Sequence, residues 1–94
     1  MAEESKIEKK FKELAHARGW RAPKFVSPGL NGMPDRIVLK DNGQVFFAEI
    51  KAPGEEARPL QLSRHAMLRK LGFRVYVIDS MEKAYAVLNI EARL

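Results

Sequence analysis

Apolar residues recur every three or four positions in three stretches of the chain, which is the period of an amphipathic α-helix. The first stretch predicts a helix over residues 4–18. The second predicts a helix over residues 58–71, with Pro59 in its first turn. The expected inner face of this second helix is apolar with one polar interruption: Leu60, Arg64, Met67, Leu68 and Leu71. The third predicts a helix over residues 81–89, which Ser80 is expected to cap.

Residues 35–40 and 44–51 are the two clearest predicted strands. Between them, residues 41–43 read Asp-Asn-Gly, and Asn-Gly is a strong hairpin signal because both residues tolerate positive φ. Residues 73–79 predict a last strand, and residues 20–27 an extended edge segment, since a proline in this segment excludes a central position. The resulting order, α-β-β-β-α-β-α, predicts an α/β fold with a mixed sheet flanked by helices.

Composition and charge narrow the class of protein. The chain has 94 residues, of which 46% are hydrophobic, so residues 1–94 are expected to form a single folded domain. It contains no cysteine, which excludes disulfides, thiolate zinc sites and thiol nucleophiles. It has no apolar run of membrane-spanning length and no signal sequence, so we expect a cytoplasmic protein without a membrane partner. The net charge of +5 favours a polyanionic partner such as nucleic acid.

The predicted hairpin brings two acidic residues together. With a three-residue loop, the register of the two strands places Asp35 directly opposite Glu49. Opposed side chains project from the same face of a sheet, with Cβ atoms roughly 4.5–5.5 Å apart. Lys51 joins them, because side chains two positions apart on a strand share a face. A register shift of one residue would separate these groups, so their juxtaposition depends on the predicted turn.

Two neighbouring carboxylates repel each other unless they share a cation. Mg²⁺ or Mn²⁺ takes oxygen ligands, keeps several waters and bridges to phosphate. We therefore predict that Asp35 and Glu49 bind such a cation, with the backbone carbonyl of Ile50 as a further ligand. Lys51 would then orient an attacking water and neutralise charge that develops on the phosphate. The alternative is a solvated charge pair, but Glu49 ends an apolar strand, where an unpartnered carboxylate is costly.

The spacing of these residues resembles a known nuclease signature. Pro34-Asp35, followed by Glu49-Ile50-Lys51, is similar to the PD-(D/E)xK pattern, and the order of elements is similar to that superfamily's core. Longer sequence words narrow the resemblance to the VRR-NUC family, and to its small stand-alone members from bacterial viruses and prophages. These words are Lys-Phe-Val-Ser-Pro-Gly (24–29), Gly-Met-Pro-Asp-Arg (32–36), Glu-Ile-Lys-Ala-Pro-Gly (49–54) and Arg-Pro-Leu-Gln (58–61).

The resemblance implies a divalent-metal-dependent DNA endonuclease that leaves a 3′-hydroxyl and a 5′-phosphate. It also implies selectivity for DNA structure, with branched DNA such as four-way (Holliday) junctions as the substrate. Lys51 matches the catalytic lysine of the family, and Gln61 its active-site glutamine, which is expected to contact water or phosphate. Glu8 matches the acidic residue on the first helix, which would hold metal-bound water or a second ion. His65, one helical turn after Gln61, is expected at the surface.

Three further residues are candidates for DNA contacts. Lys24 and Ser27 precede a Gly- and Pro-rich loop beside the acids, and Arg58 begins the second predicted helix. We expect all three to contact phosphates, although an exposed basic residue is often only solvated. A four-way junction has pseudo-two-fold symmetry and paired nicks need two active sites, so we expect a homodimer.

Two other functions stay open from the sequence. The chain could be a non-catalytic DNA-binding module on the same fold, which would retain DNA without cutting it. It could also be a small basic protein-interaction domain, which would not bind DNA at low salt. The second alternative leaves the Asp35–Glu49 pair without an explanation.

Overall fold

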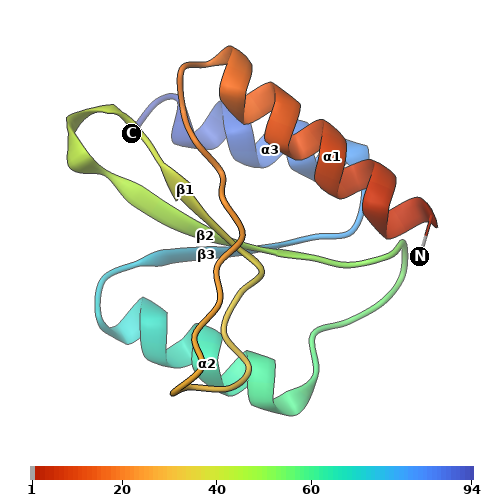
Figure 1. Cartoon of the computed structure of the whole chain (residues 1–94), viewed down its shortest axis with the longest axis vertical. Helices are drawn as coiled ribbons and strands as arrows, with labels where there is room; N and C mark the ends of the chain where they lie inside the picture. Colours follow the sequence, from red (N-terminus) through yellow and green to blue (C-terminus); the bar gives the residue numbers. More distant parts are fainter. Residues whose placement is uncertain (1) are drawn as a thin grey trace.

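The computed structural model of the chain describes residues 2–94, and side chains from residue 3 onward. Its helices and strands follow one another in this order (Figure 1): α1 (Ala2–Ala17), β1 (Arg36–Leu39), β2 (Val45–Ile50), α2 (Pro59–Lys70), β3 (Arg74–Ile78) and α3 (Met81–Glu91). Each of these elements was predicted from the sequence, with bounds that differ by no more than two residues. No helix within residues 2–94 is long and apolar enough to cross a membrane.

The three strands form one mixed sheet in the order β1-β2-β3. The central strand β2 runs antiparallel to β1 and parallel to β3. Helices α1 and α3 lie side by side on one face of the sheet, and α2 covers the opposite face (Figure 1). Both faces of β2 are therefore covered, which is why its side chains are buried in both directions. The predicted α/β fold with a mixed sheet flanked by helices is confirmed.

The hairpin between β1 and β2 has the predicted register. The ladder pairs Arg36 with Ala48, and the same alignment carries Asp35 to the level of Glu49. The turn is a short 3₁₀ segment, η1 (Asp41–Gly43), in which the asparagine and the glycine have φ of 65° and 73°. Few other residues adopt this left-handed conformation without strain, so the Asn-Gly pair fixes the register of the two strands.

The segment over residues 20–27 does not form the additional strand that the predicted element order contains. Only two isolated bridges join it to β1, one at Arg21 and one at Lys24. Pro23 lies between these bridges and has no N–H to donate, so a continuous ladder cannot form. The segment is extended along the edge of β1, as expected, but the sheet described by residues 2–94 has three strands.

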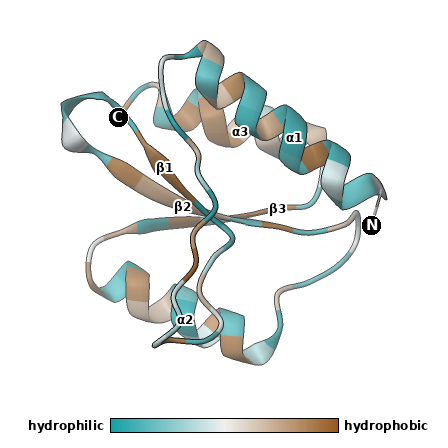
Figure 2. Cartoon of the chain, viewed as in Figure 1, coloured by the Kyte–Doolittle hydropathy of each residue, from teal (hydrophilic) through white to brown (hydrophobic). Residues whose placement is uncertain are grey.

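Side chains of β2 alternate between two apolar clusters of unequal size. Those that face α1 and α3 belong to the large cluster, and they are Phe46, Ala48 and Ile50. On the other face, Phe47 packs with Leu68 and Val75 in a small cluster beneath α2. Glu49 lies on the same face as Phe47, because alternate residues of a strand share a face. Figure 2 shows apolar stretches along the strands, and both apolar and hydrophilic residues on the three helices.

Helix α2 presents a different face to the sheet from the predicted one. Gln61 and His65 are buried, whereas Leu60 and Leu71 are 47% and 67% exposed. The predicted inner face is therefore right at Leu68 and in part at Met67, but wrong at Leu60 and Leu71, and the expectation of a surface His65 is wrong as well. Glu49 gives the physical reason, because a buried carboxylate needs hydrogen-bond donors and the two polar residues of α2 approach it.

A second buried carboxylate lies on the opposite face of the sheet, at the end of α3. Glu91 is fully buried and accepts hydrogen bonds from Arg74 at 2.6 and 2.9 Å, from the Tyr76 hydroxyl at 2.6 Å and from Lys40 at 3.0 Å. Burial alone would raise the pKa of Glu91, but these hydrogen bonds outweigh it and lower the pKa to about 2. The ionised network joins α3 to β3 and to the end of β1.

Replacing Glu91 with glutamine should destabilise the fold, because Lys40 and Arg74 would lose their shared countercharge. We expect the free energy of unfolding at pH 7 to fall by roughly 3 kcal/mol, measured by urea denaturation. The folded-state pKa of about 2 lies below the ordinary value of 4.5, so the carboxylate stabilises the protein fully above pH 4.5. The difference between wild type and variant should therefore shrink as the pH falls from 4.5 towards 2.

Glu82→Gln is the matched control, since Glu82 is an exposed carboxylate on the same helix. It should change the free energy of unfolding by no more than about 0.5 kcal/mol. Equal effects of the two substitutions would show that the Glu91 network does not stabilise the fold.

Candidate active site

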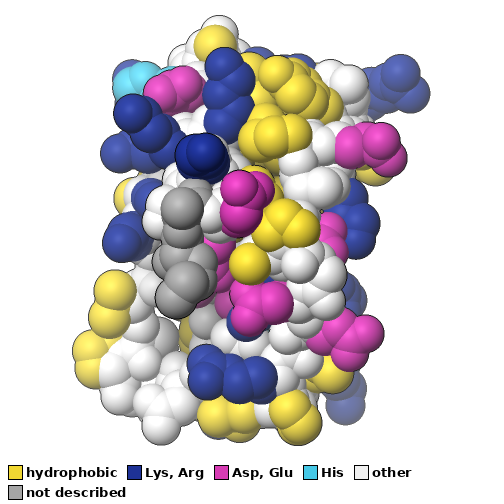
Figure 3. All heavy atoms as spheres, turned by 90° about the vertical axis from the view of Figure 1, so that its right-hand side faces the viewer, with side chains coloured by type: hydrophobic (Ala, Val, Ile, Leu, Met, Phe, Trp, Pro, Cys, Tyr) yellow, Lys and Arg dark blue, Asp and Glu magenta, His cyan; other side chains and the backbone are white. Residues whose placement is uncertain are grey.

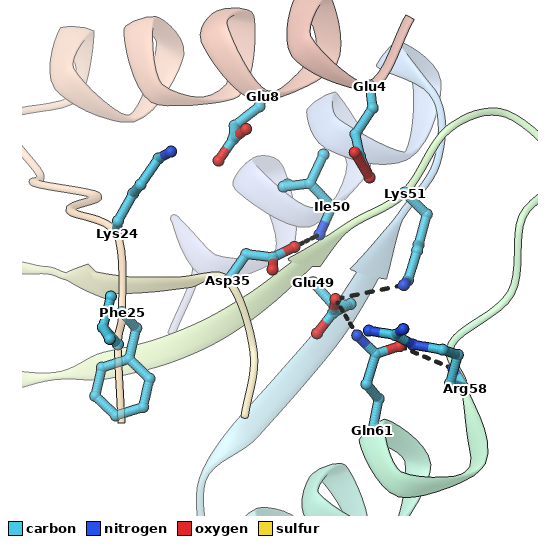
Figure 4. A pocket seen from close by; sticks show the side chains of 11 residues that line it. Glu4, Glu8, Lys24, Phe25, Asp35, Glu49, Ile50, Lys51, Arg58 and Gln61 are labelled. Atoms are coloured by element: carbon cyan, nitrogen blue, oxygen red, sulfur yellow. Dashed lines mark hydrogen bonds and ion pairs between the residues drawn. The ribbon is translucent and has the colours of Figure 1, made fainter. Parts of the chain in front are cut away.

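A cavity of about 360 Å³ opens at the end of β2, between the N-terminal parts of α1 and α2. Its lining includes most of the residues singled out from the sequence: Glu8, Lys24, Asp35, Glu49, Ile50, Lys51, Arg58 and Gln61. The ninth, Ser27, is not part of the lining. Figure 4 shows the labelled side chains converging from both helices and from the strands between them. Five segments that are distant in sequence thus meet at one point.

The two acidic residues of the hairpin lie at the centre of this cavity. Glu49 is 1% exposed, and the Oδ2 atom of Asp35 accepts a hydrogen bond of 2.9 Å from the backbone N–H of Ile50. This bond fixes the orientation of the Asp35 carboxylate beside the end of β2. Lys51 extends towards the same point, with its Nζ atom 3.7 Å from Oε2 of Glu49. The structure therefore brings the three residues of the predicted Asp plus Glu-x-Lys arrangement together.

Glu49 is held in an electrostatically unfavourable position. Burial, followed by the negative charge of Asp35, raises the pKa of Glu49 to about 8, and the ammonium of Lys51 only partly opposes this shift. A single lysine thus compensates the two carboxylates incompletely. A divalent cation between them would supply the missing positive charge.

The donor atoms at the cavity fit a hard cation such as Mg²⁺ or Mn²⁺. Asp35 and Glu49 offer carboxylate oxygens, and strand geometry directs the Ile50 carbonyl to the same side as its N–H, towards Asp35. The register places Pro34 opposite Ile50, and a proline has no N–H to occupy that carbonyl. Among the described residues, no third His, Cys, Asp or Glu side chain joins these two carboxylates to form a metal-binding group of three. Water would therefore complete the coordination of the cation.

Glu8 approaches the cavity from α1. Its Oε2 atom accepts a hydrogen bond of 2.9 Å from Nε of Arg36, and the Arg36 guanidinium also donates to the Ala22 carbonyl at 2.9 Å. This buried arginine anchors Glu8 to β1 and holds it above Asp35. Glu4, one turn earlier on α1, also lines the cavity (Figure 4), and sequence reasoning missed it. The signal for it was the four-residue spacing from Glu8, which places both on one side of a helix.

Gln61 joins the start of α2 to Glu49. Its Oε1 atom accepts a hydrogen bond of 2.8 Å from the backbone N–H of Arg58, and its Nε2 atom donates to Oε2 of Glu49 at 3.0 Å. The first contact is half of a capping box, which stabilises the N-terminus of α2. The amide is thereby oriented with its N–H₂ group towards Glu49. Gln61 therefore contacts a carboxylate in this structure. It also lines the cavity in which water or phosphate would bind.

His65 is the second residue of this site that sequence reasoning missed. It is fully buried, and its Nε2 atom lies 3.4 Å from Oε1 of Glu49. Burial, with smaller contributions from the positive charges of Arg69 and Lys51, lowers the pKa of His65, so the ring is neutral at neutral pH. The four-residue spacing from Gln61 would have placed both residues on one side of α2, had the inner face of that helix been assigned correctly.

Positive side chains surround the acidic centre. Figure 3 views the side of the molecule that lies on the right in Figure 1, and shows Lys and Arg side chains gathered in its upper part and flanking the acids below. Lys24 and Arg58 line the cavity itself and are exposed. Neither forms a salt bridge with a residue of the described chain. Their charges are therefore available to an anionic ligand.

Known proteins similar to this chain are nucleases by name or by domain description. A protein of Acyrthosiphon pisum secondary endosymbiont phage 1, named "Putative nuclease p44", is 48% identical over 79 residues, which are 84% of this chain and 85% of that protein. A solved structure described as "VRR_NUC domain" has a TM-score of 0.87 and 30% sequence identity, and covers 93% of this chain and 95% of its own. No family model matches the chain. The two similarities confirm the resemblance indicated by the sequence words.

Asp35→Asn should stabilise the protein in the absence of divalent cations, because it removes one of two repelling charges and retains an oxygen for the Ile50 N–H. The pKa of Glu49, about 8, lies above its ordinary value of 4.5, so the folded state binds the extra proton and loses stability as the pH rises through this interval. We expect the variant to lose less stability than wild type over this pH range. Its free energy of unfolding at pH 9 in EDTA should exceed that of wild type by roughly 1 kcal/mol.

Asp41→Asn serves as the control, because it removes a charge in the same way and keeps an acceptor for the Trp20 indole. It should leave the free energy of unfolding nearly unchanged. A lower stability of Asp35→Asn at pH 9 would mean that the Asp35 charge stabilises the fold and does not repel Glu49.

Proposed function

The chain belongs to the VRR-NUC family of nucleases, and from this premise we propose that it is a divalent-metal-dependent endonuclease that hydrolyses DNA phosphodiester bonds. The observation that carries the proposal is the pairing of the buried Glu49 with the half-buried Asp35, which lies beside a lysine and faces an open cavity. The negative charge of a purely structural carboxylate would be balanced by neighbouring cations and donors, as that of Glu91 is. The charges of Asp35 and Glu49 are not balanced in this way, which favours a site that binds a cation.

Asp35, Glu49 and the Ile50 carbonyl are the groups that would hold Mg²⁺ or Mn²⁺. When bound, the cation supplies Lewis-acid polarisation of the phosphate and lowers the pKa of a coordinated water. Glu8 lies on the opposite wall of the cavity, where we propose that it holds a water or a second ion near the first. The Arg36 contact keeps one of its oxygens fixed for this purpose.

Lys51 is proposed as the catalytic lysine. Its ammonium lies 3.7 Å from Glu49 and is 13% exposed, so it is shielded from bulk water yet reaches the cavity. From this position it can orient the attacking water and neutralise charge that grows on the phosphate as the 3′-oxygen leaves. Gln61 holds Glu49 through its amide and borders the space in which water and phosphate would meet.

Lys24, Ser27 and Arg58 are proposed to contact DNA. The two basic residues flank the cavity from opposite sides and have no salt-bridge partner in the described chain, which favours phosphate contacts. Ser27 lies beyond the cavity lining, in the segment that carries Lys24 and Phe25 past it, so its contact would be with a neighbouring nucleotide. The net charge of +5 supports binding to the backbone in addition to these contacts.

We further propose that the substrate is branched DNA, with four-way junctions as the main form, and that the enzyme acts as a homodimer. Residues 3–94 of one chain form one cavity lined by this acidic pair, and two symmetric nicks across a junction need two such sites. The site of action would be the cytoplasm of a bacterial host, where DNA from a phage or prophage is processed.

Lys51→Ala should abolish cleavage of labelled junction DNA and leave DNA binding within a fewfold of wild type, because the lysine is needed for chemistry and its side chain, which is only 13% exposed, adds little contact area for DNA. The assay compares single-stranded, duplex, flap, fork and four-way substrates with Mg²⁺, with Mn²⁺ and with EDTA. We expect cleavage only with a divalent cation, and fastest on the four-way substrate. A dimer should release paired-nick products, whereas a monomer would release singly nicked junctions.

Lys83→Ala is the control for this substitution, since Lys83 is an exposed lysine on α3 whose side chain forms a salt bridge with Asp79, away from the cavity. It should cleave like wild type. DNA that is bound but uncut by wild type under every condition would contradict the proposal and support a non-catalytic DNA-binding module.

Lys24→Glu and Arg58→Glu should weaken DNA binding, because each places a negative charge where a phosphate contact is proposed. We expect the KM for junction DNA to rise about tenfold and kcat to change less, with a weaker dependence of binding on salt concentration than in wild type. Lys70→Glu makes the same charge change at the other end of α2 and should have a smaller effect. If all three variants raise KM equally, the effect reflects net charge and the two residues make no specific contact.

A further inference from the structure

His65 has no role in the mechanism described so far, although it is one of the most completely buried polar residues of the chain. It lies on α2 one turn after Gln61, and both side chains point to Glu49. It is not among the residues that line the cavity, so we do not expect it to contact DNA directly. The other histidine, His16, is exposed on α1. The burial of His65 therefore needs an explanation within the protein.

The contacts of Glu49 provide one. Gln61 donates to Oε2 at 3.0 Å, and the imidazole Nε2 of His65 lies 3.4 Å from Oε1. Two side chains from the same helix thus approach the two oxygens of one carboxylate and restrict rotation of that group about its last side-chain bond. We propose that His65 is a positioning residue that holds Glu49 in the orientation needed to bind the divalent cation. This inference rests on the proposed function of Asp35 and Glu49 as cation ligands.

The two ring nitrogens of His65 indicate how it would act. Nδ1 is buried and has no hydrogen-bond partner among the described residues. A buried N–H without a partner is costlier than a buried lone pair, so the proton of the neutral ring belongs on Nε2. A carboxylate that binds a cation is ionised and can only accept. Nε2–H therefore donates to Oε1 in the cation-bound form, and each carboxylate oxygen keeps a second lone pair for the metal.

The position of α2 gives this contact a wider consequence. The Gln61 and His65 contacts both depend on the face that α2 turns to the sheet, and this is the face that places Leu60 and Leu71 in solvent. Partners of metal-binding carboxylates commonly change metal affinity 10- to 100-fold when they are removed. The orientation of the helix would thus be determined by the cation site, and its cost is that Leu60 and Leu71 stay exposed.

The test compares His65→Leu, which keeps an apolar side chain of similar volume without a donor, with His65→Gln, whose amide N–H₂ can take the place of Nε2–H. His16→Leu is the control at the exposed histidine. Mn²⁺ affinity is measured by electron paramagnetic resonance of free Mn²⁺, in the absence of DNA. Melting temperature, kcat and KM for junction DNA are measured on the same samples.

We expect His65→Leu to weaken Mn²⁺ binding at least tenfold and to lower kcat, with an unchanged KM for DNA and a melting temperature equal to or above that of wild type. His65→Gln should recover most of the Mn²⁺ affinity, and His16→Leu should match wild type in every measurement. Wild-type Mn²⁺ affinity in His65→Leu, or equal losses in the Leu and Gln variants, would overturn the positioning role. Failure of the wild-type protein to bind Mn²⁺ would instead overturn the proposed function on which this role rests.

Discussion

Burial of Glu49 beside Asp35 is the constraint on which the arrangement of the active face depends. An acidic side chain at the end of a covered central strand needs hydrogen-bond donors or a cation. This site contains donors, and it also fits a cation. Gln61 and His65 turn inward on α2, and Lys51 folds back towards the pair. Their combined effect still leaves the pKa of Glu49 at about 8. The residual imbalance is the feature that a bound cation would remove.

The two buried glutamates of the protein show what distinguishes a structural carboxylate from a functional one. Glu91 receives donors from Lys40, Arg74 and Tyr76, which overcome the effect of burial and lower its pKa to about 2. Glu49 has a second carboxylate as a neighbour, and its pKa moves in the opposite direction. The first network contributes to stability without an added ligand. The Glu49 network has its charge balanced only when a ligand is added, which is why sites of this kind mark functional positions.

The hairpin and the acidic pair could be predicted from the sequence because their information is local. An Asn-Gly turn fixes the register, and the two-residue period of strands then determines which side chains face each other. The face of α2 could not be predicted in this way. Leu60 and Leu71 favour one rotation, whereas the buried Glu49, on a strand that is distant in sequence, favours the other, and this is why the sequence predicts a surface His65. The missing strand over residues 20–27 has a local cause that was visible, namely Pro23, whose effect was underestimated.

The unequal apolar clusters on the two faces of the sheet explain how the chain tolerates so much polarity at one end. The large cluster lies between the sheet and the α1–α3 layer, and it contains the bulky side chains of both helices. Beneath α2 the buried cluster consists of Phe47, Leu68 and Val75, with four partly buried apolar side chains packed against it, and the polar contacts to Glu49 lie in the same interface. The free energy gained by hydrophobic burial is roughly proportional to the apolar area buried, so most of the hydrophobic stabilisation comes from the face covered by α1 and α3. The second face can then hold an incompletely compensated carboxylate pair without loss of the fold.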